Sequence, residues 1–266
     1  MNYTLGEIAK IIGISKEGIR YFEKQNCIRE PKRNASGYRE YDPWQMGTLR
    51  WLKLYRSYDY TLKESAELLE IGQANERTEI FERGLARTEA QIVFLQRRAA
   101  DLRDFLNERA RVEAEENKIE EIISPGLYRV SFEYKEQLLL QERGENFFRP
   151  WIEHMPFVKY TPAFYKADIE QGVFAMDYGF GIFERDIFNW RPWESPHVQY
   201  FSPRRCVTAI VRSCCLSMDS FRAMFEYMNA RSLILDGDFF CRPIDIRQNG
   251  DLPEFICRYY LPVREM

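Results

Sequence analysis

The residues most suited to chemistry are the basic side chains of the first 56 residues, and the chemistry they suit is the binding of a polyanion. This segment holds 11 Lys and Arg against 6 Asp and Glu, a local charge of +5 on a chain whose net charge is -3. A near-neutral total argues against a protein that coats nucleic acid by bulk charge, but it allows one basic face. The exposed side of a predicted helix carries Lys16, Glu17, Arg20, Tyr21 and Lys24.

Cysteine and histidine, the other residues that could do chemistry, are placed unfavourably for it. Only two histidines are present, and none of the six cysteines forms a C-x-x-C pair. We therefore expect no catalytic centre, no metal site and no cofactor. The adjacent Cys214 and Cys215 would point to opposite faces of a strand, and we interpret them as a buried structural pair.

Short helices must position the basic side chains. Thr4 with Glu7 forms a predicted capping box, Gly13 ends the first helix, and Ser15 can cap a second helix that begins at Lys16. Two helices joined by such a turn make a helix-turn-helix, whose second helix can enter a DNA major groove. A basic turn follows over residues 31–41, with Gly37 at its tight position. Further helices are predicted to start at Asp42-Pro43, with an apolar side of Met46, Leu49, Leu52, Leu54 and Tyr55, and at the Thr61–Glu64 capping box.

Residues 76–117 carry a heptad pattern with no proline. Its apolar positions are Phe81, Leu85, Thr88, Ile92, Leu95, Ala99, Leu102 and Leu106. A long helix with a seam of this kind is typical of a coiled coil, because one helix cannot bury the seam alone. We expect a homodimer through the 76–117 helix. The alternative is packing of the helix against its own domain.

The remaining part of the chain is aromatic and alternates like strands. Residues 122–266 hold 27 of the 40 Phe, Tyr and Trp. Strands are predicted around Tyr128 to Tyr134, at Phe164, and over 173–183, 207–211, 238–246 and 254–262, with helices at 145–152 and 217–231. The predicted fold class is an α part followed by an α+β part with an antiparallel sheet. We expect three domains, 1–75, 76–120 and 121–266.

An ordered set of residues in the first 70 positions resembles the MerR family of bacterial transcription regulators. The set comprises Tyr3-Thr-Leu-Gly-Glu-Ile-Ala-Lys10, Gly13-Ile-Ser15, Ile19-Arg-Tyr-Phe-Glu23, Ser36-Gly-Tyr-Arg39, Tyr41 and Tyr60-Thr-Leu-Lys-Glu64. The resemblance implies a winged helix-turn-helix and a long coiled-coil dimerisation helix. Tyr60 stands where the family has an apolar residue.

The resemblance also implies partners and site residues. Such proteins bind and distort a pseudo-palindromic promoter as homodimers, so that RNA polymerase holoenzyme can engage it, which is recognition through DNA deformation. The residues carried over as DNA contacts are Ser15, Lys16, Arg20, Tyr21, Tyr38 and Arg39. For Lys53 and Arg56, a solvated helix face and a DNA contact are equally consistent with the sequence.

The C-terminal part resembles the GyrI-like effector-binding domain of the BmrR-like, multidrug-sensing type of this family. The resemblance implies a pocket for a small hydrophobic effector, lined by Phe148, Trp151, Tyr160, Phe239, Cys241 and Phe255. Each could instead be ordinary core. Cys241 stands where the type has a glutamate that meets cationic ligands. Replacement carboxylates could come from Glu145, Asp177, Glu184 or Asp245. The aromatic segment 188–193 could be a lid or an anchored surface loop.

The leading hypothesis is an effector-dependent transcription activator that senses a hydrophobic or aromatic molecule, either cationic or neutral. In one alternative the C-terminal domain binds a protein partner, and in another it hydrolyses its ligand. The sequence has neither a membrane-spanning run nor the pattern of a signal peptide, so we expect a cytoplasmic bacterial protein located on DNA. The identity of the effector and of the promoter stays open.

Overall fold

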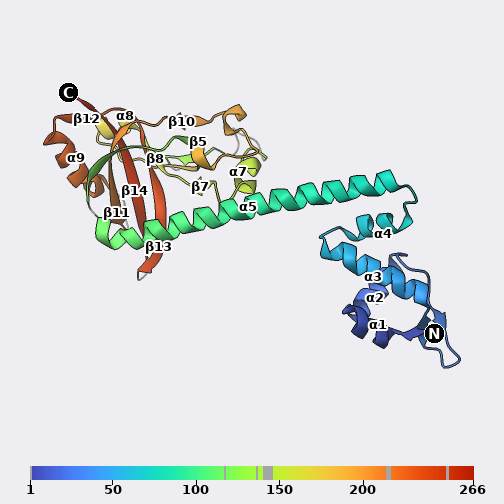
Figure 1. Cartoon of the computed structure of the whole chain (residues 1–266). Helices are drawn as coiled ribbons and strands as arrows, with labels where there is room; N and C mark the ends of the chain where they lie inside the picture. The colour runs from blue at the N-terminus through green and yellow to red at the C-terminus, as the bar shows by residue number, and fades with distance from the viewer. Residues whose placement is uncertain (1, 117, 136, 140–145, 214–216, 250–251) are drawn as a thin grey trace. The chain divides into compact units, whose positions relative to one another are not determined.

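A computed structural model describes residues 2–116, 118–135, 137–139, 146–213, 217–249 and 252–266. They form two compact units, 1–95 and 96–266, and the chain is coloured along its length in Figure 1. Glu145, Cys214 and Cys215 lie outside the described residues. None of the helices in the described part of the chain is long and apolar enough to cross a membrane.

Short helices and a small sheet build the N-terminal unit, and their ends lie where the sequence predicts them. Thr4 and Glu7 form a reciprocal capping box, Gly13 has the left-handed φ of 69°, and Ser15 Oγ accepts from the Gly18 N–H. The elements are β1 (Tyr3–Thr4), α1 (Leu5–Ile12), α2 (Lys16–Lys24), β2 (Lys32–Arg33), β3 (Arg39–Tyr41), α3 (Pro43–Ser57), α4 (Leu62–Glu70) and α5 (Ala74–Glu115).

One apolar core joins α1, α2 and α3 to the sheet, whose strand order is β1-β3-β2. Its fully buried members are Ile8, Ile19, Tyr41, Leu49 and Leu52. The prediction that Leu54 faces inward is wrong: it is 39% exposed, because the buried stripe of α3 runs through positions 45, 46, 49, 52 and 55. The helix-turn-helix is thus a packed unit with one face left free.

Tyr60 fixes the start of the long helix α5. Its side chain is 3% exposed, its hydroxyl donates to the Ile80 carbonyl at 3.2 Å, and its ring meets Phe81 edge-on at 5.9 Å. This close approach requires a glycine at position 84, since a Cβ there would stand 2.1 Å from the Tyr60 hydroxyl.

The predicted heptad positions of α5 are largely exposed. Exposures range from 38% at Phe81 to 61% at Leu106 for the large apolar members, which are Phe81, Leu85, Ile92, Leu95, Leu102 and Leu106. The long helix is confirmed, and its apolar stripe is not buried by the chain itself.

The C-terminal unit is an antiparallel sheet with helices, which confirms the predicted α+β class. The sheet order is β10-β5-β9-β8-β13-β14-β11-β4, with β6, β7 and β12 paired at its sides. The strands are β4 (Glu120–Ile123), β5 (Leu127–Tyr134), β6 (Gln137–Leu138), β7 (Lys159–Tyr160), β8 (Ala163–Phe164), β9 (Asp177–Phe183), β10 (Gln199–Phe201), β11 (Arg205–Ser213), β12 (Leu233–Leu235), β13 (Phe239–Asn249) and β14 (Leu252–Glu265).

The helices of this unit are shorter than predicted. Within the described residues 146–152, the segment expected to be helical begins its helix at Arg149, as α7 (Arg149–Glu153), and the strand expected from residue 173 begins at Asp177. The helix expected over 217–231 is divided into η3 (Met218–Phe221) and α9 (Arg222–Asn229). The remaining helices are α8 (Lys166–Glu170), η1 (Glu184–Asp186) and η2 (Pro192–Glu194).

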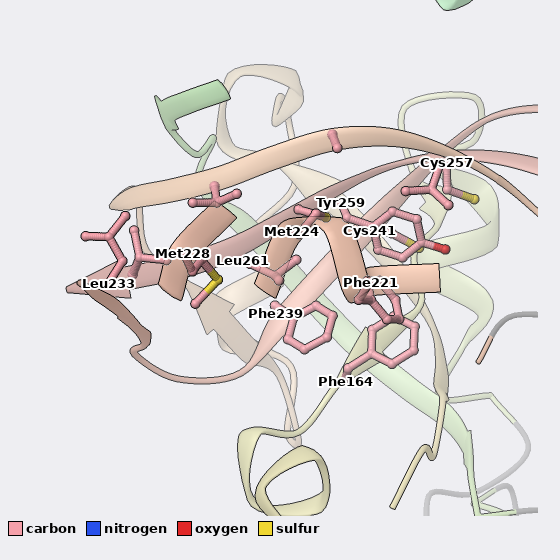
Figure 2. Close-up of a cluster of buried hydrophobic side chains, with 14 residues drawn as sticks. Phe164, Phe221, Met224, Met228, Leu233, Phe239, Cys241, Cys257, Tyr259 and Leu261 are labelled. Carbon is pink, nitrogen blue, oxygen red and sulfur yellow. The ribbon is translucent and has the colours of Figure 1, made fainter. Parts of the chain in front are cut away.

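Helix α9 and η3 cover one face of the central strands and bury the largest apolar cluster of the unit, as Figure 2 shows. Met224 and Met228 of α9 and Phe221 of η3 pack over Phe239 and Tyr259 of the sheet. Phe164 stacks on Phe239 with ring centroids 4.8 Å apart. Because successive strand residues alternate in direction, the neighbours of these side chains point to the opposite face.

A buried ion pair lies between strands β5 and β9. Arg129 and Asp177 are both 0% exposed, and Arg129 Nη2 lies 2.7 Å from Asp177 Oδ1. The guanidinium also donates to the Thr161 carbonyl at 2.7 Å and to Gln199 Oε1 at 3.0 Å. Asp177 accepts from the hydroxyls of Ser131 and Tyr165. Every charged atom of the pair therefore has a partner, as burial requires.

The contact between Tyr60 and Gly84 generates a stability prediction. Gly84→Ala should destabilise the protein by about 1–3 kcal/mol through overpacking, despite the better helix propensity of alanine. Gly47→Ala in α3 is the matched control, because a Cβ there meets nothing within 4 Å, and it should stabilise by up to about 1 kcal/mol. Urea denaturation followed by circular dichroism measures both. Equal gains in the free energy of unfolding for both variants would show that the Tyr60 hydroxyl does not crowd position 84.

Candidate functional site

The start of α2 presents polar groups to solvent. Ser15, Lys16 and Arg20 are exposed, and Tyr21 is 53% exposed. Neither Lys16 nor Arg20 has an ion-pair partner within the described ranges. The Ser15 hydroxyl already caps the helix, so the groups left for a phosphate here are the two cations and the first backbone N–H groups of α2.

Asn34, which the sequence reading did not single out, organises the turn between β2 and β3. Its Oδ1 accepts from the N–H groups of Ser36 and Tyr38, each at 3.0 Å. Gly37 occupies the left-handed region with φ of 81°. Tyr38 is held at the tip with 72% of its side chain exposed. The signal that could have revealed Asn34 is its type, because asparagine side chains often mimic a backbone turn.

Glu23 joins this turn to α2. Its carboxylate lies 3.4 Å from Arg39 Nε and accepts from the Tyr41 hydroxyl. Burial raises the pKa of Tyr41, Glu23 raises it further, and Arg39 and Arg20 act on it in the opposite direction. Arg20 of α2 and Arg39 of β3 thus both act on the Tyr41 hydroxyl.

The two basic residues of α3 that the sequence left open have different environments. The Arg56 guanidinium donates to the Tyr60 carbonyl, so Arg56 closes the end of α3. Lys53 is exposed on the same helix. Arg56 thus has a structural contact, whereas no hydrogen bond or ion pair joins the Lys53 side chain to a described residue.

Five aromatic rings on β5, β7, β9 and the N-terminal side of α7 form what we call the aromatic face: Phe132, Phe148, Tyr160, Tyr178 and Phe180. The ring centroid of Phe132 lies 5.1 Å from that of Phe180 and 6.1 Å from that of Tyr160. The rings of Tyr160 and Tyr178 stack with their centroids 5.9 Å apart. A cavity of about 580 Å³ opens beside three of these rings. Its lining residues are Phe132, Leu138, Phe148, Arg149, Ile152, Glu153 and Phe180.

The six predicted effector residues are divided among three places. Phe148 and Tyr160 belong to the aromatic face. Trp151 is fully buried on α7 and meets Trp190 edge-on at 4.8 Å. The other three, Phe239, Cys241 and Phe255, belong to the core under α9.

Cys241 nevertheless lies near the aromatic face. Its N–H donates to the Pro162 carbonyl at 2.9 Å. The pKa of Tyr160 is raised first by burial, then by Tyr178 and by Cys241. Burial raises the pKa of the Cys241 thiol itself, so this group is neutral and brings no charge to a ligand.

Of the acids suggested by the sequence, the three that the structure describes already have partners. Asp177 pairs with Arg129, the Glu184 carboxylate accepts from Tyr200 at 2.8 Å, and Asp245 lies 3.2 Å from Arg247. Sequence reading missed Glu133. It stands opposite Tyr178 in the strand register, and no ion pair joins it to any residue that the structure describes. The pKa of Tyr178 is raised by burial and then by Glu133, which places this carboxylate beside the ring.

The aromatic segment 188–193 is anchored at three points. Phe188 meets Phe157 edge-on at 5.0 Å, Trp190 stacks on His154 at 4.4 Å, and Trp193 lies 5.7 Å from Tyr128. Of the two alternatives for this segment, a lid or an anchored surface loop, these contacts favour the anchored surface loop.

Comparison with known proteins identifies the first unit. The model of the MerR HTH family regulatory protein matches residues 3–71. The mercuric resistance operon regulatory protein of Bacillus cereus is 36% identical over 76 residues, which cover 29% of this chain and 58% of that protein. The HTH-type transcriptional regulator HmrR of Sinorhizobium medicae is 30% identical over 102 residues, covering 38% of this chain and 68% of the relative.

A solved structure, the cryo-EM structure of an EcmrR–DNA complex in EcmrR-RPo, aligns with 99% of this chain and 100% of that chain. Its identity is 16% and its TM-score 0.39, too low to establish a shared fold. The sequence matches carry the assignment, although the chain spans little more than half the length of the Bacillus cereus relative. With the helix-turn-helix observed where the family model aligns, the chain belongs to the MerR family of helix-turn-helix regulatory proteins.

Proposed function

We propose that this protein regulates transcription by binding promoter DNA as a homodimer and by sensing a small aromatic molecule in its C-terminal unit. The DNA-binding part of the proposal rests on the exposed cations of α2 inside a segment that matches the family model. An effector-dependent activator that distorts its promoter for RNA polymerase holoenzyme is the mode that the family resemblance suggests. Membership in a family of regulators disfavours the hydrolase alternative.

The proposed interface consists of α2 and the β2–β3 turn, which acts as a wing. Lys16 and Arg20 would neutralise phosphates, Tyr21 and Tyr38 would pack on the backbone, and Arg39 would contribute while retaining Glu23. The proposed functional division is 1–75 for DNA, 76–120 for dimerisation and 121–266 for the effector. Lys16 and Arg20 share two properties: both are exposed, and neither forms an ion pair with a residue that the structure describes.

Dimerisation is proposed through the stripe on α5. Six large apolar side chains at heptad spacing and 38–61% exposure form an unusual surface for a lone chain. A second copy of the same helix would bury them as a two-stranded coiled coil.

The proposed effector site is the aromatic face with Glu133. The rings supply apolar area and cation–π attraction. The Glu133 carboxylate, which pairs with none of the described residues, supplies a charge where Cys241 is neutral. Arg149 and Glu153 at the rim neutralise each other at 2.7 Å. The site therefore favours a hydrophobic, aromatic molecule that carries a positive charge over a neutral one. A protein partner remains the alternative occupant of the C-terminal unit.

The DNA interface predicts the effect of Arg20→Ala. On a fragment selected in vitro with the wild-type protein, affinity should fall about tenfold at 0.1 M salt, and the slope of log K against log salt should flatten by about 0.9. Arg111→Ala, which removes another exposed arginine outside the family match, is the control and should change neither value. Fluorescence anisotropy titrations measure both. An unchanged slope in Arg20→Ala would remove this residue from the interface.

The dimer seam predicts a contrast between neighbouring positions. Ile92 and Val93 are both 49% exposed, but only Ile92 lies on the heptad stripe. Ile92→Glu should raise the dimer dissociation constant by roughly 100-fold or more, because two charges would be desolvated per dimer. Val93→Glu should leave the dimer dissociation constant within about threefold of the wild-type value, as expected for a solvated position. Sedimentation equilibrium distinguishes the two, and equal effects would rule out this seam.

The effector face predicts a charge-dependent effect of Glu133→Gln. The affinity for tetraphenylphosphonium should fall about threefold to tenfold, whereas that for the neutral triphenylphosphine oxide should stay within about twofold. Glu226→Gln, which removes an exposed carboxylate on α9 outside the cavity, is the control and should change neither affinity. Isothermal titration calorimetry measures each affinity. Equal losses for both probes would show that the Glu133 charge plays no part.

A further inference from the structure

The inner side of α5 in the C-terminal unit is acidic, and the sheet face that it covers is basic. Lys159 Nζ lies 2.6 Å from Asp101, and Arg212 Nη2 lies 3.0 Å from Glu116. Apolar contact is small here: among the described residues, Val112 is the one member of α5 in the small cluster with Ile210, Ile244 and Ile256. Charge pairs therefore hold this part of the helix on the sheet more than apolar burial does.

Glu108 lies at the centre of this contact. Arg242 of β13 and Arg258 of β14 stand directly opposite each other in the strand register. The two oxygens of Glu108 bridge them, at 2.8 Å to Arg242 Nη2 and 3.3 Å to Arg258 Nε. All three side chains are only 12–13% exposed. Arg258 also pairs with Glu115 at 2.9 Å, whereas Glu108 is the carboxylate that the described residues give Arg242, so without Glu108 the Arg242 charge would face Arg258 with little water to screen it. We call these three residues the Glu108 clasp.

The other face of the same two strands lies in the core under α9. Cys241 precedes Arg242 by one residue, and Tyr259 follows Arg258 by one residue; the two also stand opposite each other in the register. Because side chains alternate along a strand, Cys241 and Tyr259 point to the other face, into the core drawn in Figure 2. Cys241 is tied through its N–H to the Pro162 carbonyl, two residues from Tyr160. The aromatic face lies on β5, β7 and β9, and this hydrogen bond connects β13 to the short segment between β7 and β8.

We propose that the Glu108 clasp is the device that couples the effector face to α5. While it is closed, β13 and β14 keep one arrangement and the inner side of α5 is docked. A ligand that changes the packing around Tyr160 and Cys241 changes the strand pair and so loosens or tightens the clasp. By reciprocity, the clasp then changes the affinity for that ligand. The inference rests on the proposed effector function and adds its route to the dimerisation helix.

The first test needs no ligand and uses the full-length protein. Labelling by N-ethylmaleimide, resolved by cysteine with mass spectrometry, reports local opening of buried thiols. Cys241 and Cys257 lie on the strands of the clasp, whereas Cys206 is buried on β11 in the same unit. Glu108→Gln should raise the labelling rates of Cys241 and Cys257 at least tenfold and that of Cys206 less than threefold. Glu113→Gln, at a site that is 72% exposed, should leave all three rates unchanged.

The second test uses tetraphenylphosphonium and amide exchange of residues 103–113. The probe should change the exchange of these amides in the wild type and in Glu113→Gln, and should still bind Glu108→Gln without that change. By reciprocity the affinity for the probe should change in Glu108→Gln and stay at the wild-type value in Glu113→Gln, whereas a purely structural role would leave the exchange response the same in all three proteins. Equal acceleration of all three thiols, or a preserved exchange response in Glu108→Gln, would overturn the coupling. If the wild type fails to bind the probe, the proposed cation sensing fails, and the thiol pattern alone decides on the clasp.

Discussion

The buried pair of Arg129 and Asp177 is the interaction on which the C-terminal unit depends. A charge without a partner at such depth would cost several kcal/mol, so the strands that bring the two together cannot shift independently. The network also restrains neighbouring groups: Tyr165, which donates to Asp177, has its pKa raised to about 12, first by burial and then by that carboxylate. Because the pair holds β5 and β9 in one register, it also sets the positions of the aromatic rings on the opposite face of these two strands.

Local sequence signals predicted the N-terminal unit well because its determinants are local. The capping boxes at Thr4 and Thr61 and the left-handed Gly13 are each decided by residues within one helical turn. The effector side was harder. Alternation along β5 predicts Phe132 and Tyr134 on one face, but the register shifts between Ser131 and Glu133, so Tyr134 faces Asp177 instead. A bulge of this kind depends on the partner strand, and it brings Glu133 beside Phe132.

The charges of the molecule fall into two classes. Arg129, Arg242 and Arg258 are mostly buried, and each meets a carboxylate, so they hold strands and helix together. Lys16, Arg20 and Glu133 have no ion-pair partner in the described part of the chain. Sequence composition could detect the excess of cations in residues 1–56. It could not separate Glu133 from the other acids, because pairing is a property of three-dimensional neighbours.

The apolar stripe along α5 has a consequence for the abundance of the protein. Side chains from Phe81 to Leu106 lose contact with water only when another molecule supplies the cover. Stability gained in this way grows with protein concentration by mass action. At the few copies at which regulators often act, newly made chains would spend longer with the stripe uncovered, open to proteases and to non-specific association. If a second copy supplies that cover, as proposed, the amount synthesised would affect how much folded protein survives, independently of any signal.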